Sequence, residues 1–176
     1  MIVSTNPSKV RPFVVAAILR NVTFDEDRYK SFIDLQDKLH QNVCRKRSLV
    51  SIGTHDLETI TFPVHYDARA PKEIKFVALN QKESLTAEQL MEFYAKDSHL
   101  KPYLGIIQGK SVYPVIMDTK NTVLSFPPII NSEHSKITLK TKNVFIEITA
   151  TDENKASLVL DTIVCMFSQY SSSQFR

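Results

Sequence analysis

Apolar residues recur at helical spacing in two long segments of this chain. In residues 25–47 the apolar positions are Tyr29, Phe32, Ile33, Leu39 and Val43. Either Thr23 or Asp25 can cap the start of this segment, and acidic residues fill the first turn, where they suit the helix dipole. The run CRKR supplies three cations at the other end, where positive charge is favourable. The sequence therefore predicts one long helix over residues 25–47.

The second amphipathic segment, residues 152–170, closes the chain. Its apolar face collects Leu158, Val159, Ile163, Met166, Phe167 and Tyr170. Thr151 or Asp152 is the expected N-cap, because both side chains can accept a hydrogen bond from the first turn. Three shorter helical pieces are also expected, in residues 84–97 with Thr86 as cap, in residues 99–110, and directly after Gly53.

Strand patterns, rich in β-branched residues and bounded by polar breaks, fill much of the remaining chain. They crowd together after residue 111, where only short turns separate them. The expected strands are residues 10–22, 62–71, 73–79, 111–118, 122–130, 136–141 and 143–150. Because helices and strands are interspersed without regular β-α alternation, the sequence predicts an α+β fold, with β-sheets packed against flanking helices.

One expected strand, residues 143–150, carries a glutamate among apolar residues. Strand alternation places Phe145, Glu147 and Thr149 on one face and the aliphatic residues on the other. Periodicity alone favours a solvent-exposed position for the face that carries the glutamate. Phe145 on that same face argues instead for a covered site, so both interpretations stay open.

The composition suits a globular protein and excludes several chemistries. A chain of 176 residues fits one domain, and no apolar run is long enough to span a membrane. Three glycines are too few for a glycine-rich phosphate loop. The five histidines lack metal-ligand spacing, and no nucleophile motif surrounds Cys44 or Cys165. We therefore expect no metal or cofactor in this domain, no membrane partner, and a reducing, cytoplasmic location.

Two stretches have the residue types of a binding surface. The Pro127–Pro128 pair interrupts a strand beside Ser125 and Asn131, and prolines leave backbone groups free for either a pocket wall or an edge strand. The net charge of +3 is mild, but residues 44–47 concentrate three cations. Such a run is compatible with a solvated surface and also with nucleic-acid contact.

Five stretches of the chain are distinctive, namely RPFVVAAILRNV, LHQNVCRKRSLVSIGTHDLETI, YPVIMD, LSFPPIINSEHSKI and FIEITATD. In this order they resemble the B3/4 domain, the editing domain of eukaryotic- and archaeal-type phenylalanyl-tRNA synthetase β subunits. The resemblance covers residues 10–170 and implies a B3/4-type fold of two interleaved lobes. Because those β subunits are much longer, it also implies one domain, residues 1–176, excised from a longer chain. Residues 1–9 and 171–176 are expected to be flexible ends.

The resemblance further implies an activity, hydrolysis of the ester of mischarged tyrosyl-tRNA(Phe). The implied partners are tRNA(Phe), its tyrosine moiety and the synthetase α subunit, while ATP and Mg bind elsewhere in the parent enzyme. By motif, the editing residues fall on Ile116, Ser125, Glu147 and Thr149, and archaeal members carry aspartate where this chain has Glu147. The expected catalytic residues are Ser125, Thr149 and Asn131, the substrate-binding residues Glu147, Ile116, Phe145 and Pro127, and the tRNA-binding residues Arg45, Lys46 and Arg47.

The family's activity gives Glu147 a physical role. A pocket built to hydrogen-bond a hydroxyl group rejects the analogue that lacks it, so a buried carboxylate would select tyrosine over phenylalanine. Two other functions remain open. A non-catalytic tRNA-docking or scaffolding module would use the CRKR cations without hydrolysis, and a free amino-acid sensor would use the pocket without RNA.

Overall fold

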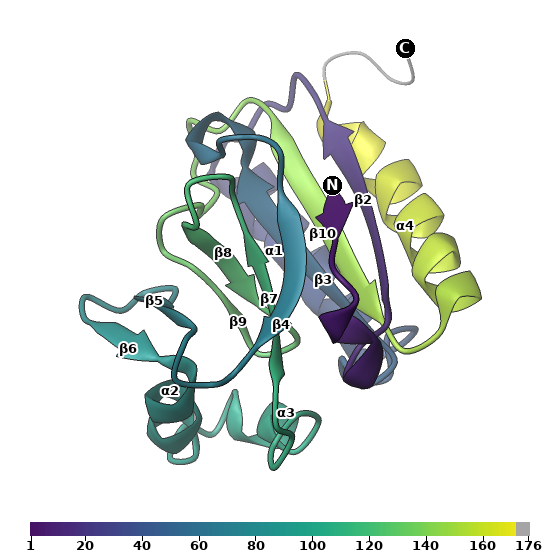
Figure 1. Ribbon diagram of the computed structural model, residues 1–176. Coiled ribbons are helices and arrows are strands. Elements are labelled where there is room, and N and C mark those ends of the chain that lie inside the picture. Colours follow the sequence, from purple (N-terminus) through teal and green to yellow (C-terminus); the bar gives the residue numbers. More distant parts are fainter. Residues whose placement is uncertain (172–176) are drawn as a thin grey trace.

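Four stacked layers make up residues 1–171, the part of the chain that the computed structural model describes (Figure 1). Two long helices cover one face of a three-stranded sheet, and a five-stranded sheet packs against its other face. Two short helices and a β-hairpin cover the far side of the five-stranded sheet. This arrangement confirms the predicted α+β class with sheets flanked by helices.

The three-stranded sheet holds the last strand of the chain at its centre. Its order is β2 (Phe13–Leu19), β10 (Val144–Ala150) and β3 (Val50–Asp56), and both pairings are antiparallel. In this register Glu147 lies between Ala16 and Gly53. Every residue of β10 is buried, because helices cover one face of the sheet and the second sheet covers the other.

The five-stranded sheet is assembled from both the amino-terminal end and the middle of the chain. Its order is β1 (Ile2–Val3), β4 (His65–Arg69), β7 (Tyr113–Met117), β8 (Val123–Phe126) and β9 (Ile130–Asn131). The hairpin of β5 (Lys75–Val77) and β6 (Ser84–Thr86) lies beside it. Because the chain passes from one sheet to the other and back, the two lobes interleave.

Four α-helices occur within residues 1–171: α1 (Glu26–Gln41), α2 (Ala87–Tyr94), α3 (Lys101–Leu104) and α4 (Glu153–Phe167). Short 3₁₀ turns form at Asn6–Lys9, Leu57–Thr59 and Ser168–Tyr170. The three longer helices begin where the sequence predicts. Asp25 and Asp152 accept from backbone N–H groups of the first turn, and Thr86 forms a capping box with Gln89.

Two predicted helical regions are only partly correct. Helix α1 ends at Gln41, and the backbone of Arg45, Lys46 and Arg47 is left-handed, with φ of 49°, 52° and 65°. A left-handed run cannot continue a right-handed helix, so these cations do not occupy a last helical turn. The short helix expected after Gly53 is wrong for residues 54–56, which belong to β3 and pair with β10, and a single 3₁₀ turn follows at Leu57–Thr59.

A further difference from the predicted elements occurs at residues 136–141. Residues 136–141 form a turn instead of a strand, in which Thr141 Oγ1 accepts from the Thr138 amide and donates to Asp56 Oδ2. Residues 1–9, expected to be flexible, contain β1 and a 3₁₀ turn, and the Ile2 amide donates to the Val64 carbonyl. The predicted flexible segment 171–176 lies outside the described residues, except for Ser171.

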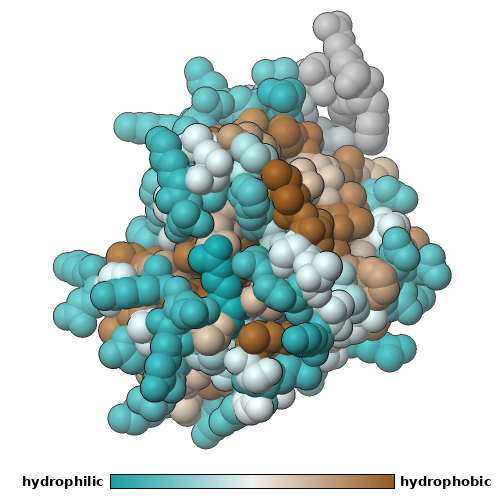
Figure 2. All heavy atoms as spheres, in the orientation of Figure 1, coloured by the Kyte–Doolittle hydropathy of each residue, from teal (hydrophilic) through white to brown (hydrophobic). Residues whose placement is uncertain are grey.

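The surface in Figure 2 is mainly hydrophilic, with an apolar patch over β1 and β2. Its exposed side chains include Ile2, Val3 and Ile18. The aromatic core lies on the opposite side of the three-stranded sheet, under α1 and α4. There the Phe32 ring stacks on Phe167 with ring centroids 3.8 Å apart. Since α1 also carries one wall of the pocket described below, this packing fixes part of the site.

Replacing Phe32 with alanine should lower the free energy of unfolding of the 176-residue chain by about 3–5 kcal/mol, because removal of a fully buried ring leaves a cavity. Urea denaturation measures the loss. Phe93→Ala is the matched control, since the Phe93 side chain is 48% exposed and its removal should cost about 1 kcal/mol or less. Equal losses in the two variants would contradict the central position of Phe32.

Candidate active site

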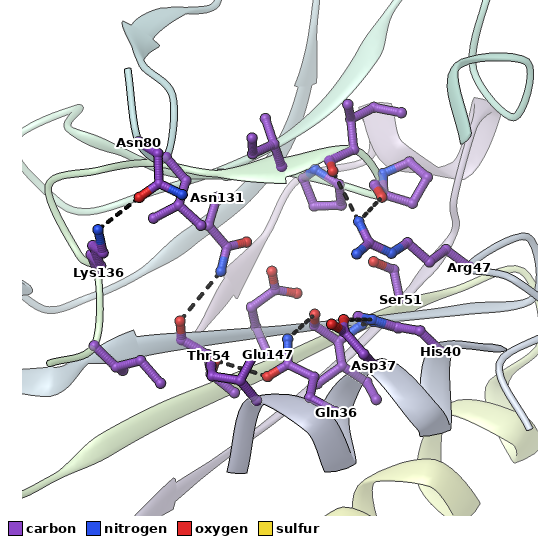
Figure 3. A pocket seen from close by; sticks show the side chains of 18 of the residues that line it. Gln36, Asp37, His40, Arg47, Ser51, Thr54, Asn80, Asn131, Lys136 and Glu147 are labelled. Carbon is purple, nitrogen blue, oxygen red and sulfur yellow. Dashed lines mark hydrogen bonds and ion pairs between the residues drawn. The ribbon is translucent and has the colours of Figure 1, made fainter. Parts of the chain in front are cut away.

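A pocket of about 390 Å³ opens where the edge strand β3 meets α1 and residues 127–131 (Figure 3). Helix α1 supplies one wall, through Gln36, Asp37 and His40. The opposite wall is the segment that connects β8 to β9, which contains the cis Pro127–Pro128 peptide. The carboxylate of Glu147 projects between these walls from the central strand β10. The pocket therefore combines an apolar wall with a charged group in its interior.

Glu147 is 2% exposed, and its two carboxylate oxygens have different surroundings. Oε1 accepts a hydrogen bond from the Ser125 hydroxyl at 2.8 Å. Oε2 has no hydrogen-bond partner among residues 1–171, although it is buried. An unpaired buried oxygen is costly, so this atom is the natural acceptor for a ligand's donor. The open question about the strand's second face is thus resolved, because that face is covered by the five-stranded sheet.

A second polar pair lies behind the carboxylate. His55 Nε2 is 3.8 Å from Glu147 Oε1, and His55 Nδ1 is 2.8 Å from the Ser135 hydroxyl. His55 is fully buried and its ring lies 6.1 Å from that of Phe145, its cross-strand partner. Glu147 is therefore surrounded on the sheet side by fixed polar groups, and only its Oε2 is left for the pocket.

Helix α1 is joined to β3 by side-chain hydrogen bonds. The Ile52 amide donates to His40 Nε2 at 2.9 Å, and the Thr54 hydroxyl donates to Gln36 Oε1 at 2.9 Å. Because Nε2 accepts, the neutral His40 ring carries its proton on Nδ1, which lies 4.0 Å from the Asp37 carboxylate. Burial lowers the pKa of His40, with the Asp37 contact acting in the opposite direction. This wall therefore contains a neutral imidazole.

Arg47 closes the pocket at the end opposite Thr54 and Asn131 (Figure 3). Its Nη1 donates to the backbone carbonyls of Pro128 and Ile129, at 3.4 and 3.0 Å, and its guanidinium lies 4.4 Å from the Tyr103 ring centroid. The left-handed backbone at residues 45–47 turns this side chain inward, while Arg45 and Lys46 are exposed. Burial lowers the pKa of Arg47.

Arg11 is the second buried charge near Glu147. It is 1% exposed, and its Nε and Nη2 donate to the side-chain and backbone oxygens of Thr149, at 3.2 and 2.8 Å. A third hydrogen bond, from Nη1, reaches the Ser48 carbonyl. Burial lowers the pKa of Arg11, while the nearby Tyr66 and Glu147 act in the opposite direction. The hydroxyl of Thr149 is therefore used to hold a buried guanidinium.

The residues predicted from the sequence occupy four different places in the structure. Four line the pocket, namely Glu147, Pro127, Asn131 and Arg47. Ser125 and Thr149 lie behind the pocket, bound to Glu147 and Arg11, and Ile116 and Phe145 belong to the apolar core between the sheets. Arg45 and Lys46 are exposed outside the pocket. None of these contacts tests the roles assigned to the residues, which stay predictions.

The sequence patterns did not reveal the residues that α1 and β3 bring to the site. His40, Gln36 and Thr54 were not singled out, and neither were His55 and Gly53, which flank Glu147 from β3. A signal for the last two was present. If residues 50–56 are interpreted as a strand, alternation places Gly53 and His55 on one face of that strand. In the pairing of β3 with β10 this is the face that carries Glu147, and the aliphatic residues of β10 lie on the other face. Because Gly53 in the middle of the segment was interpreted as a break between elements, this alternation was not recognised.

The fold and the site define an α+β domain of two packed sheets, with a pocket between α1, β3 and residues 127–131. The family model described as "B3/4 domain" matches residues 3–163, and this chain belongs to that family. It is 65% identical to the phenylalanine–tRNA ligase β subunit of Caenorhabditis elegans over 99% of the chain, and 57% identical to that of Homo sapiens over 99%. Each match spans 30% of the relative.

A solved structure agrees with these sequence matches. It is an N-terminal fragment of the phenylalanyl-tRNA synthetase β subunit from Pyrococcus horikoshii, with a TM-score of 0.87 and 36% identity. The match covers 96% of this chain and 48% of that fragment. These comparisons confirm the resemblance deduced from the motifs and the B3/4-type fold. The chain spans about 30% of the length of these curated relatives.

The relative from Arabidopsis thaliana, 59% identical over the whole chain and 29% of its own length, is named a cytoplasmic β subunit. Within residues 1–171 no helix is both long and apolar enough to cross a membrane. Burial raises the pKa of the Cys44 thiol to about 12, so this thiol is a poor nucleophile. The expectation of ATP and Mg outside this domain stays a prediction.

The neutral His40 gives a pH dependence to stability. Its folded pKa lies below the usual 6.5, so as pH falls through 6.5 the unfolded chain binds a proton that the folded protein does not. The free energy of unfolding should therefore decrease on acidification from about pH 7 to about pH 5. In His40→Gln, whose amide oxygen can still accept from Ile52, this part of the slope should disappear.

Urea unfolding at a series of pH values measures that slope. His99→Gln is the matched control, because His99 is exposed and its replacement should leave the wild-type pH dependence unchanged. Parallel curves for the wild-type protein and His40→Gln would show that His40 is not the group responsible.

Proposed function

We propose that this chain is the editing domain of a phenylalanyl-tRNA synthetase β subunit and hydrolyses the ester of tyrosyl-tRNA(Phe). The proposal is carried by Glu147, a buried carboxylate that faces a pocket with one oxygen held by Ser125 and the other unpaired within residues 1–171. Membership of the B3/4 family and the similarity to β subunits support it. In the parent enzyme, tRNA(Phe) and the α subunit are the proposed partners, with ATP and Mg bound outside this domain.

Selection of tyrosine follows from the unpaired Oε2 of Glu147. A tyrosine side chain in the pocket would donate its phenol proton to this oxygen, and such a bond to a charged group contributes about 1.5–3 kcal/mol. A phenylalanine side chain would exclude water from the same oxygen and give nothing in return. The pocket therefore discriminates through the free-energy cost of burying the unpaired Oε2 against phenylalanine. This is the discrimination that an apolar synthetic site cannot achieve against an added hydroxyl.

Hydrolysis of an aminoacyl ester needs a positioned water and stabilisation of the developing oxyanion. Asn131 and Ser51 present polar side chains at the pocket and are suited to that work. The Ser125 hydroxyl donates to Glu147 and the Thr149 hydroxyl accepts from Arg11. In this mechanism those two side chains hold the charged groups in place, and the water reacts without a protein nucleophile.

Glu147→Gln in a full-length β subunit, assembled with its α subunit, tests the proposal. Loss of the charged acceptor should reduce kcat/KM for deacylation of tyrosyl-tRNA(Phe) by about 10- to 100-fold. Release of tyrosine from purified tyrosyl-tRNA(Phe) measures the rate. Glu92→Gln is the matched control, since Glu92 is exposed on α2.

Aminoacylation with phenylalanine should be unaffected in both variants, because the ligase site lies outside this domain. Deacylation at the wild-type rate in both Glu147→Gln and Glu147→Ala would reject the editing assignment. In that case calorimetry with free tyrosine and phenylalanine separates an amino-acid sensor from a tRNA-docking module.

A role in tRNA binding is favoured by Arg45 and Lys46, which are exposed beside the pocket wall formed by Arg47. Phosphate contacts by such cations contribute affinity that falls with salt concentration. Arg47 itself is bound to backbone carbonyls inside the pocket, so we assign it to the pocket wall. The proposed tRNA contact therefore uses two of the three cations of the CRKR run.

Arg45→Ala/Lys46→Ala should weaken tRNA(Phe) binding by the full synthetase and reduce the slope of log affinity against log salt by about 0.7–0.9 for each phosphate interaction removed. Filter binding at several salt concentrations measures both quantities. The matched control is Lys140→Ala/Lys142→Ala, which removes two exposed cations at the opposite end of β10. Equal effects of the two double variants would show that only net charge matters.

A further inference from the structure

Gly53 lies directly opposite Glu147 in the pairing of β3 with β10. A methyl group built at Gly53 would meet Glu147 Oε1 at 2.1 Å, Cδ at 2.7 Å and Cγ at 3.1 Å. These are the three nearest heavy atoms outside its chain neighbours, and all belong to one side chain. The glutamate therefore lies across the α-carbon of Gly53 and fills the space that any other residue's Cβ would need.

Backbone conformation does not require glycine at this position. Gly53 sits inside a regular strand, and its φ lies outside the left-handed region. A glycine inside a strand weakens it and commonly marks a close approach of another group. Here the approaching group is the Glu147 carboxylate, so glycine is required because a Cβ atom would occupy the space that this side chain fills.

The position of Gly53 in the sheet explains why this free space matters for the pocket. Glu147 belongs to the central strand, whereas the pocket opens beyond the edge strand β3, beside α1. To reach the pocket, the carboxylate must extend sideways over β3, and it does so at Gly53, where no side chain obstructs it. Ser51 and His55, the neighbours on the same strand face, both carry side chains.

We infer that Gly53 is a positioning residue for tyrosine selection, a gap in the edge strand through which Glu147 extends its carboxylate from the central strand into the pocket. Positions 53 and 147 are then a matched pair, in which a long acid requires a glycine. This inference rests on the proposed editing function for its effect on deacylation, but the steric coupling between the two positions does not depend on that function.

The test is a double-mutant cycle in the full synthetase, comparing Gly53→Ala, Glu147→Asp and the double variant. Gly53→Ala should displace the carboxylate and reduce kcat/KM for tyrosyl-tRNA(Phe) deacylation by about 10- to 100-fold. In the aspartate background the side chain is one methylene shorter, so no atom takes the Oε1 position at 2.1 Å, and the carboxyl carbon takes the position of Cγ at 3.1 Å. The carboxyl oxygens can then rotate about the Cβ–Cγ bond, away from the position of Cδ at 2.7 Å. There the added methyl should change the rate by no more than about twofold, so the two substitutions are strongly non-additive.

Gly105→Ala is the matched control, because a methyl group at Gly105 meets nothing within 4 Å. It should leave deacylation and thermal unfolding unchanged. Phenylalanine aminoacylation should be normal in every variant. The same cycle measured by thermal unfolding gives a second readout, in which Gly53→Ala lowers the midpoint in the glutamate background much more than in the aspartate background.

A wild-type deacylation rate in Gly53→Ala, or an equal effect of the methyl group in both backgrounds, would overturn the inference. So would equal failure of Gly53→Ala and the double variant to fold, since the methyl would then clash with something other than the glutamate. If Glu147→Gln itself deacylates normally, the proposed function fails, and the unfolding cycle alone decides whether positions 53 and 147 are coupled.

Discussion

The burial of one carboxylate on the central strand is the constraint on which the site depends. A charged group removed from water is strongly unfavourable unless hydrogen bonds and an opposite charge compensate. Ser125 provides the hydrogen bond from the facing sheet. Arg11, held by Thr149 on the same strand, provides a buried positive charge in the same layer. The two sheets must therefore pack in one relative position for Glu147 to be tolerated at all.

The interleaved path of the chain supplies that position. Strand β10 is the last strand in the sequence, and it pairs with β2 and β3, both formed from the first third of the chain. Its second face is covered by strands from the middle of the chain. Ser125, Gly53 and Glu147 meet only when these three regions are assembled. The site is thus a property of the complete fold and of no single motif.

Local signals explain which parts of the structure the sequence could predict. The caps at Asp25, Thr86 and Asp152 are chemical signals within one turn, so the longer helices begin as expected. Strand β3 is buried on both faces and contains a glycine, so neither alternation nor propensity marked it. Periodicity placed Glu147 on the correct face of β10. It could not show whether that face meets water or a second sheet, because that depends on residues far away in the chain.

The sequence singled out Glu147 through the family motifs, and Pro127 and Asn131 through the proline-interrupted strand, and the structure places all three at the pocket. It could not assign geometry to Ser125 and Thr149, whose hydroxyls are both committed to buried charges. This arrangement has an energetic consequence. The desolvation of the Glu147 carboxylate is completed when the chain folds, and its orientation is fixed by the sheet before any ligand arrives. In the proposed reaction a phenol therefore meets a preorganised acceptor on rigid strands, with little reorganisation left for the binding step.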